Sequence, residues 1–425
     1  MTDILFGILG LAVLIGIAFL FSNNKKKIKW QQVGLGIGLQ ILFAMFVILT
    51  PWGASVFNAI GNFFVKIISF TNEGSKFVFG GLAEQKNFGF IFAFQILPTI
   101  IFFSSLMSVL YHLGIMQKIV QGMAWVMAKL LKISGAESIS VAANVFIGQT
   151  EAPLVVRPYV ESMTKSELLT LMIGGMATIA GGVLAAYVGL LGGSDPAQQL
   201  FYAKHLLSAS IMAAPATIVI AKILVPETEK SLTMGEVKVP IERTSANVIE
   251  AAATGAADGL KLALNVAGML LAFIALIAMT NWIITGLATD MAGLTTASGD
   301  PITLELILGY LLSPIAWIIG VPWHDAVQVG SLIGQKVVLN EFIAYLKLSQ
   351  LIPTGVMGEK AVIISTYALC GFANFSSIAI QIGGIGGIAP TRRSDLARFG
   401  LRAVLGGSLA TFMTATIAGV LIALL

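Results

Sequence analysis

A cluster of polar residues interrupts an apolar stretch of the chain at residues 148–153. Gln149, Thr150 and Glu151 stand side by side there. Pro153 follows closely, and proline prevents an unbroken helix because it removes a backbone donor. These side chains accept and donate hydrogen bonds, which suits a polar, mostly uncharged ligand with hydroxyl or N–H groups. A carboxylate beside broken backbone inside a membrane predicts a functional site.

A second acid, Glu341, has a similar setting beside Asn340, between apolar segments. A charge at the middle of a bilayer costs at least about 2.5 kcal/mol, so a ligand or a partner must recover that cost. One of the two glutamates could instead carry a proton, or pair with Lys336 or Arg157.

Neutral oxygens lie near the first cluster, on Asn144 and Thr178. Together with carbonyls freed by a helix break, such oxygens can hold a dehydrated sodium ion. Each residue alone is more typical of a helix-packing hydrogen bond. The three histidines are scattered and the chain has no P-loop motif, so zinc and nucleotide-phosphate sites are not expected.

The elements that must position these residues are membrane helices. Hydrophobic residues make up 57% of the 425 and charged residues 11%, far below the roughly 25% of charged residues in soluble proteins. Apolar runs long enough to cross a bilayer recur along the chain. We therefore predict an all-α polytopic membrane protein. The net charge of +4 indicates basic cytoplasmic loops, and nucleic acid is not an expected partner.

The predicted architecture has eight transmembrane helices, two re-entrant hairpins and one interfacial helix. The interfacial helix covers residues 52–70, which are aromatic but also carry Asn58, Asn62 and Lys66. The hairpins cover residues 114–165 and 304–345, which are too polar for ordinary spans. The spans cover residues 4–21, 33–51, 88–111, 168–191, 206–224, 259–284 and 361–382, with a last span ending at residue 425.

Charge distribution predicts the orientation and helps to divide the chain. Lysines follow the first span and arginines precede the last, so both loops are expected in the cytoplasm and both termini in the periplasm of a bacterial inner membrane. The predicted units are residues 1–113 (N-terminal spans, interfacial helix and scaffold), 114–225 (first repeat), 226–258 (hydrophilic loop), 259–301 (scaffold span and loop) and 302–425 (second repeat).

Two parts of the chain repeat one another. Residues 147–159 align with residues 333–345 through a shared Ile-Gly-Gln opening and a closing tyrosine. Each hairpin is followed by a span with a broken centre, at residues 178–182 and 371–377. Three spans separate the hairpins, so the second copy enters the membrane from the opposite face. Paired broken segments in inverted repeats indicate a secondary transporter with its substrate and ion near the midplane.

Several long motifs resemble those of the concentrative nucleoside transporters, in the right order and over nearly the whole chain. They are residues 148–153 (GQTEAP), 255–266 (GAADGLKLALNV), 314–322 (PIAWIIGVP), 334–345 (GQKVVLNEFIAY) and 368–377 (ALCGFANFSS). The resemblance implies a homotrimer of eight-span protomers. In each protomer, a transport part built from the hairpins and broken spans would slide like an elevator against a scaffold.

The resemblance also implies a nucleoside site with Val183 and Phe372 as apolar contacts. Polar side chains would bind the base (Gln149, Thr150, Glu151) and the ribose hydroxyls (Glu341, Asn374, Ser377). A sodium ion would be held by the side chains of Asn144 and Thr178 and by the carbonyls of Ile147 and Ile179.

The sequence therefore predicts a sodium-coupled symporter for nucleosides such as uridine, not an enzyme. Some members of the family use protons, but the presence of both Asn144 and Thr178 favours sodium. A membrane-embedded enzyme would need a nucleophile, a metal or a phosphate cluster, and none is found. A channel is disfavoured by the inverted, broken repeat.

Overall fold

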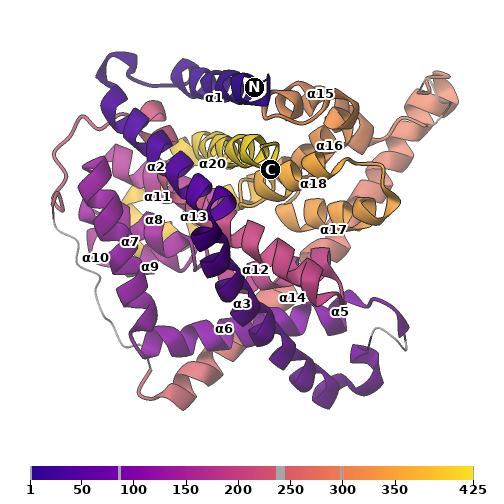
Figure 1. Ribbon diagram of the computed structural model, residues 1–425, viewed down its shortest axis with the longest axis horizontal. Coiled ribbons are helices and arrows are strands. Elements are labelled where there is room, and N and C mark those ends of the chain that lie inside the picture. Colours follow the sequence, from indigo (N-terminus) through magenta and orange to yellow (C-terminus); the bar gives the residue numbers. More distant parts are fainter. Residues whose placement is uncertain (1, 85–87, 236–244, 297–298, 300, 425) are drawn as a thin grey trace.

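The computed structural model describes residues 2–84, 88–235, 245–296, 299 and 301–424, and its regular elements are helices (Figure 1). This confirms the prediction of an all-α polytopic membrane protein. Within the described residues, eight helices are long and apolar enough to cross a membrane. They are Asp3–Leu20, Trp30–Leu49, Pro51–Ala83, Phe92–His112, Lys165–Gly192, Pro196–Leu224, Val248–Thr289 and Pro390–Ile422.

The number of long helices equals the predicted number of spans, but one member differs. Predicted span seven is absent from the set because it consists of two shorter helices, α18 (Glu359–Ala368) and α19 (Phe375–Ile388). The additional member begins with α3 (Pro51–Phe79), which is longer than the helix predicted for residues 52–70. Thr50 caps α3, and Gly80, with a φ of 56°, ends it. Its position at the membrane interface stays a prediction.

The N-terminal spans are α1 (Thr2–Leu20) and α2 (Trp30–Leu49). Predicted span three is interrupted and forms two helices, α5 (Phe92–Gln95) and α6 (Leu97–His112). The helix α6 packs along α14 (Val248–Thr285). At Gly255 and Gly259 of α14, an added Cβ would lie within 2.6–2.7 Å of Ser108 and Ser104 on α6. Small residues at this spacing let two membrane helices approach closely.

The hydrophilic loop predicted for residues 226–258 is too long, because its last residues already belong to α14. Asn247 caps this helix by accepting a hydrogen bond from the amide of Glu250 at 2.9 Å. Alanines, the best helix formers, follow in the first turns. Residues 236–244 of the predicted loop lie outside the described residues.

The first hairpin is shorter than predicted, because residues 114–165 also contain a separate helix, α7 (Ile115–Leu131). Gly114 and Lys132, both with left-handed backbone, bound α7. Apolar residues of α7 recur at helical spacing on its buried side: Met116, Val120, Ala124, Met127 and Leu131. The hairpin itself consists of α8 (Gly135–Asn144), an irregular tip, α9 (Ala152–Val155) and α10 (Arg157–Val160).

The rest of the first repeat follows the prediction more closely. Span four is α11 (Lys165–Ala177) and α12 (Gly181–Gly192), separated by a break at residues 178–180. Span five, α13 (Pro196–Leu224), begins earlier than predicted because Asp195 caps it and Pro196 takes its first turn.

The second repeat has the same order of elements. Residues 304–345 again hold a separate helix, α15 (Leu304–Ile318), before the hairpin, so the second hairpin prediction was also too long. The hairpin is α16 (Ala326–Val338) and α17 (Glu341–Leu351), and α18 and α19 flank the break at residues 369–374. The last helix, α20 (Arg393–Ile422), ends just before residue 425, which lies outside the described residues.

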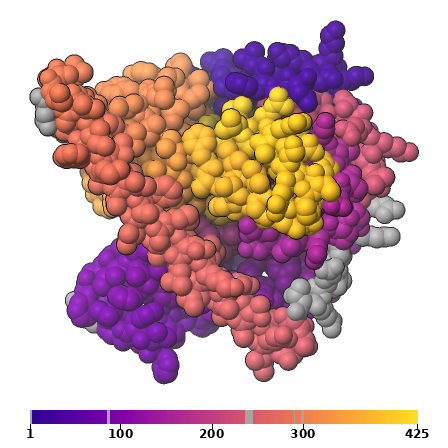
Figure 2. All heavy atoms as spheres, turned by 180° about the vertical axis from the view of Figure 1, so that it is seen from behind, coloured from indigo at the N-terminus to yellow at the C-terminus, as the bar shows by residue number. Residues whose placement is uncertain are grey.

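The two hairpins lie on opposite sides of the molecule, with α20 between them (Figure 1). Figure 2 shows α14 crossing the other face diagonally, outside the core formed by α20 and the hairpins. In the apolar window of α14 only 17% of the residues are buried, against 83% in that of α20. The repeats therefore form the packed centre, and α14 leaves most of its apolar surface exposed.

We expect Gly259→Ala to lower the melting temperature of the purified protein by several degrees. The new Cβ would lie 2.8 Å from the Cα atom of Ile101, and overpacking of this kind costs about 1–3 kcal/mol. Gly268→Ala on the same helix is the matched control, because nothing lies within 4 Å of its added Cβ. Equal melting temperatures for the two variants would contradict close packing of α6 and α14.

Candidate substrate and ion sites

The second hairpin and the second helix break meet through Glu341 and Asn374. Asn374 donates from Nδ2 to Oε2 of Glu341 at 3.1 Å, while its Oδ1 accepts from the amide of Ser377 at 2.9 Å. Asn374 therefore caps α19 and binds Glu341 at once. Tyr187 of α12 donates to the other carboxylate oxygen of Glu341 at 2.9 Å. All four residues are buried, so the carboxylate is held from two sides by elements of both repeats.

The tip of the first hairpin joins the same group of side chains through Gln149. Its Nε2 donates to Oγ of Ser377 at 3.0 Å, and its Oε1 accepts from Nε2 of Gln381 at 3.2 Å. Gln381 also donates to the carbonyl of Met172 on α11 at 3.0 Å. We call the connected residues Tyr187, Glu341, Asn374, Ser377, Gln149 and Gln381 the polar network. It links both hairpins and both broken spans.

The other residues predicted to contact the substrate differ in burial and in packing. Val183 is buried on α12 and Phe372 is half-buried in the second break. Thr150 packs beside α19, where an added Cβ at Gly384 would lie 3.4 Å from its methyl group. Asn340 caps α17 by accepting from the amide of Ile343 at 3.0 Å, which fixes the turn that presents Glu341.

Glu151 is not buried, contrary to the expectation from sequence. Its side chain is exposed and lines a cavity of about 330 Å³ between the first hairpin and the helices α6 and α14. Tyr111 and Asp258 line the same cavity. Only Thr150 separates Gln149, in the polar network, from Glu151, in the cavity, because the irregular tip turns the two side chains to different sides.

The residues predicted to hold sodium gather at the end of α11. Thr178 donates to the carbonyl of Gly174 at 2.8 Å, and Nδ2 of Asn144 would lie 3.2 Å from a Cβ at Gly174. The buried Oδ1 of Asn144 has no hydrogen-bond partner. Among the described residues, the carbonyls of Ile147 and Ile179 also accept no hydrogen bond. Neutral oxygens without partners suit a cation of the sodium type.

Further hydrogen bonds fix the backbone around these oxygens. The amide of Gly181 donates to the carbonyl of Phe146 at 2.9 Å, which ties the first break to the hairpin tip. Ser210 of α13 donates to the carbonyl of Val145 at 3.0 Å. The neighbouring carbonyls of Val145 and Phe146 therefore accept hydrogen bonds, whereas those of Ile147 and Ile179 stay available to a ligand.

Sequence reasoning missed two members of the polar network, Tyr187 and Gln381. A signal was available, because Tyr187 stands four residues after Val183 and Gln381 four residues after Ser377. Residues four apart share one face of a helix. A polar residue at that spacing from a predicted contact is therefore a candidate member of the same site.

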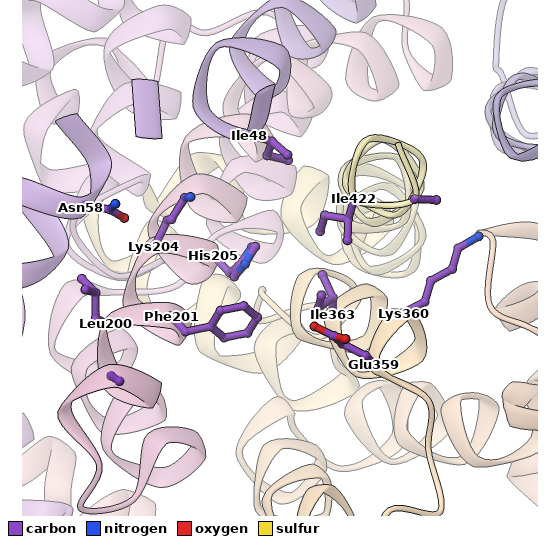
Figure 3. A pocket seen from close by; sticks show the side chains of 12 residues that line it. Ile48, Asn58, Leu200, Phe201, Lys204, His205, Glu359, Lys360, Ile363 and Ile422 are labelled. Carbon is purple, nitrogen blue, oxygen red and sulfur yellow. The ribbon is translucent and has the colours of Figure 1, made fainter. Parts of the chain in front are cut away.

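A larger cavity of about 670 Å³ lies between α2, α3, α13, α18 and α20. Phe201, Lys204 and His205 of α13 line one side of it, and Glu359 of α18 lies across from them (Figure 3). None of the predicted site residues lines this cavity. The polar network and the smaller cavity therefore remain the candidate path for substrate.

Three family models match the chain in series. Residues 9–82 match the N-terminus of the Na⁺ dependent nucleoside transporters, and residues 205–419 match the C-terminus. Residues 93–194 match a model described as nucleoside recognition. The chain belongs to the concentrative nucleoside transporter family. The membership agrees with the geometry described above, in which two hairpins and two helix breaks meet at the polar network.

Related proteins match over the full chain. An uncharacterized transporter, YutK, of Bacillus subtilis is 48% identical over 99% of this chain and 100% of its own length. The nucleoside permease NupC of Helicobacter pylori is 40% identical, with 99% and 98% covered. Mouse sodium/nucleoside cotransporter 1 is 40% identical over 97% of this chain, which spans 63% of that longer protein.

Solved structures of the transporter CNTnw share the fold. Its inward-facing, substrate-bound state matches with a TM-score of 0.91 and 44% identity, covering 99% of this chain and 98% of the other. An outward-facing variant matches with a TM-score of 0.92 and 44% identity, covering 100% and 99%. These relatives and neighbours are transporters, which confirms the prediction of a transporter and not an enzyme.

We expect Tyr187→Phe to weaken nucleoside binding by about tenfold in this concentrative nucleoside transporter, because Glu341 loses a hydrogen bond to a charged group, worth roughly 1.5–3 kcal/mol. Calorimetric titration of the purified protein with uridine measures the change. Tyr310→Phe is the control, since Tyr310 is 63% exposed on α15. Unchanged affinity in Tyr187→Phe would remove Tyr187 from the site.

Proposed function

We propose that this protein is a sodium-coupled symporter that imports nucleosides such as uridine across a bacterial inner membrane. The observation that carries the proposal is the polar network, in which Gln149, Glu341, Asn374 and Ser377 are joined across both repeats. Donors and acceptors from two halves of the molecule suit a neutral solute with several hydroxyl groups. The names of the mouse relative and the family models support sodium and nucleoside as the two ligands.

Within this site the ribose binds to Glu341, Asn374 and Ser377. A carboxylate is the strongest acceptor available for two neighbouring hydroxyl groups, and burial of Glu341 excludes the water that would compete with them. The base lies toward the first hairpin tip, where Gln149 and Thr150 offer both donors and acceptors and Glu151 faces the adjoining cavity. Val183 and Phe372 supply apolar surface to the base.

Sodium binds at the end of α11, where Asn144 and Thr178 supply side-chain oxygens. The carbonyls of Ile147 and Ile179 complete this set. The unpartnered Oδ1 of Asn144 supports the assignment, because a buried acceptor without a partner costs about 1–3 kcal/mol. The ion supplies the driving gradient, and this chain supplies the oxygens and excludes water from them.

Transport proceeds by an elevator motion of the two repeats against a scaffold that contains α6 and α14. The cavity that holds Glu151 lies at this boundary, and the tightly packed glycines of α14 suit a rigid scaffold. The apolar face that α14 leaves open suits contacts in a homotrimer. The lysines after the first span and the arginines before the last support a periplasmic position for both termini by the positive-inside rule.

A proton-coupled nucleoside symporter is the second candidate. Glu151 and Asp258 line one cavity, and two carboxylates facing the same cavity offer a route for protons. Uptake of labelled uridine into proteoliposomes, with sodium and pH gradients imposed separately, decides between the two ions. Accumulation of uridine driven by a pH gradient alone, with no response to sodium, would contradict the sodium proposal.

Replacement of the Thr178 hydroxyl should weaken sodium binding. We expect Thr178→Val to raise the sodium concentration for half-maximal uptake by about tenfold, the value of one lost charged contact. Thr178→Ser keeps the hydroxyl and should change it far less. If Val and Ser variants respond alike to sodium, the side chain of Thr178 is not a ligand.

Glu341→Gln and Asn374→Ala should abolish uridine uptake while the protein stays folded and trimeric. Each substitution removes an acceptor or a donor at the proposed ribose site and leaves the helices in place. Uptake, gel filtration and uridine titration on the same preparations measure this. Near-normal uridine affinity in both variants would contradict the ribose assignment.

A further inference from the structure

Lys336 is a fully buried ammonium group in the second hairpin that the proposed transport site does not use. Its side chain is 0% exposed on α16. Nζ donates to the carbonyl of Ala368 at 2.8 Å and to Oγ1 of Thr411 at 3.1 Å, and lies 5.9 Å from the ring centre of Phe412. Lysine is almost never fully buried without a paired charge.

Neither glutamate of the proposed site forms an ion pair with Lys336. The ion pairs of the described residues within 4.0 Å do not include it. Its main partner is instead a carbonyl at the end of α18, since Ala368 is the last residue of that helix. The end of a helix carries unpaired carbonyls and a partial negative charge. The ammonium of Lys336 therefore neutralises the helix end that the second break exposes.

The first repeat has a corresponding arrangement around the proposed sodium site. There the end of α11 meets Asn144 of the hairpin arm α8, and Ser210 of the last span α13 binds the hairpin. In the second repeat the end of α18 meets Lys336 of the hairpin arm α16, and the hydroxyl comes from Thr411 of the last span α20. The correspondence is one of place in the fold, because the alignment of residues 147–159 with 333–345 pairs Lys336 with Thr150 and not with Asn144.

The two places differ in one respect, which is whether their oxygens already have a partner. In the first repeat Oδ1 of Asn144 is buried and unpartnered. In the second repeat the oxygens of Ala368 and Thr411 both bind the ammonium. The protein therefore supplies its own cation, the ammonium of Lys336, in the second repeat, and within the described residues it supplies none at Asn144 in the first.

We propose that Lys336 is the resident cation of the second repeat and occupies the position equivalent to that of sodium in the first. This inference rests on the sodium site proposed above. It makes Lys336 a positioning residue, because its ammonium holds the end of α18 against the hairpin that carries Glu341. The second half of the site is therefore ordered before any ligand arrives, and only the first half depends on an exchangeable ion.

The test compares Lys336→Met, which keeps the length and removes the charge, with Lys347→Met on the exposed side of α17. In sodium-driven proteoliposomes we expect Lys336→Met to raise the KM for uridine about tenfold or more, with a smaller change in maximal rate. Lys347→Met should match the wild type. An unchanged KM in Lys336→Met overturns the inference.

Chemical rescue separates a charge effect from a packing effect. Lys336→Ala leaves space for a small cation, so methylammonium added on both sides of the membrane should lower the raised KM, whereas methanol at the same concentration should not. Equal rescue by methanol would assign Lys336 to packing alone. If Lys336→Ala does not fold, Thr411→Val provides a second test. It removes one acceptor of the ammonium and should raise the KM for uridine by a smaller factor. An unchanged KM in Thr411→Val also contradicts the inference.

The wild-type sodium titration keeps the two proposals apart. Uptake that ignores sodium overturns the sodium coupling on which the inference rests. Normal sodium dependence in the wild type, together with an unchanged KM in Lys336→Met, overturns only the proposal that Lys336 is the resident cation.

Discussion

The structure depends on one constraint, which is that backbone groups freed by a helix break inside a membrane must find partners. The span that follows each hairpin is broken, between α11 and α12 and between α18 and α19. Asn374 satisfies the start of α19 through the amide of Ser377, and Lys336 satisfies the end of α18 through Ala368. The hairpin tip accepts from the amide of Gly181 at the first break. Each hairpin thus enters the membrane to meet the break of its own repeat.

The breaks and the polar residues were predictable because each is a local exception in apolar sequence. Prolines, glycines and acids inside long hydrophobic runs marked both hairpins and both breaks. The helix α7 was not separated from the first hairpin because it shares the mixed polarity of its surroundings. The helix α15 is apolar, but it is only 15 residues long and contains Pro314, so it was read as part of the second hairpin and not as an element of its own. The early start of α14 was missed for a related reason, because a charged residue at 258 is tolerated on an exposed helical turn.

The orientation of single side chains in the irregular tips was beyond the sequence. Residues 149 to 151 follow neither a helical nor a strand period, so nothing in their spacing assigns Gln149 to the polar network and Glu151 to the cavity beside α6 and α14. Tyr187 and Gln381 pose the opposite problem. Their spacing was informative, but a lone tyrosine or glutamine in an apolar helix is more often a packing residue, and only the contact with Glu341 or Gln149 distinguishes the two.

The short distance along the chain between the proposed ion and substrate ligands gives coupling a physical basis. Ile147 offers its carbonyl to the proposed ion site and Gln149 its amide to the polar network, with Gly148 between them. Both functions require the same conformation of one tip, and the bond from Gly181 to Phe146 extends that requirement to the first break. Whichever ligand binds first orders the tip, so the second meets a smaller entropic cost. In the proposed symporter this coupling is reciprocal, so sodium is expected to raise nucleoside affinity by the same factor by which nucleoside raises sodium affinity.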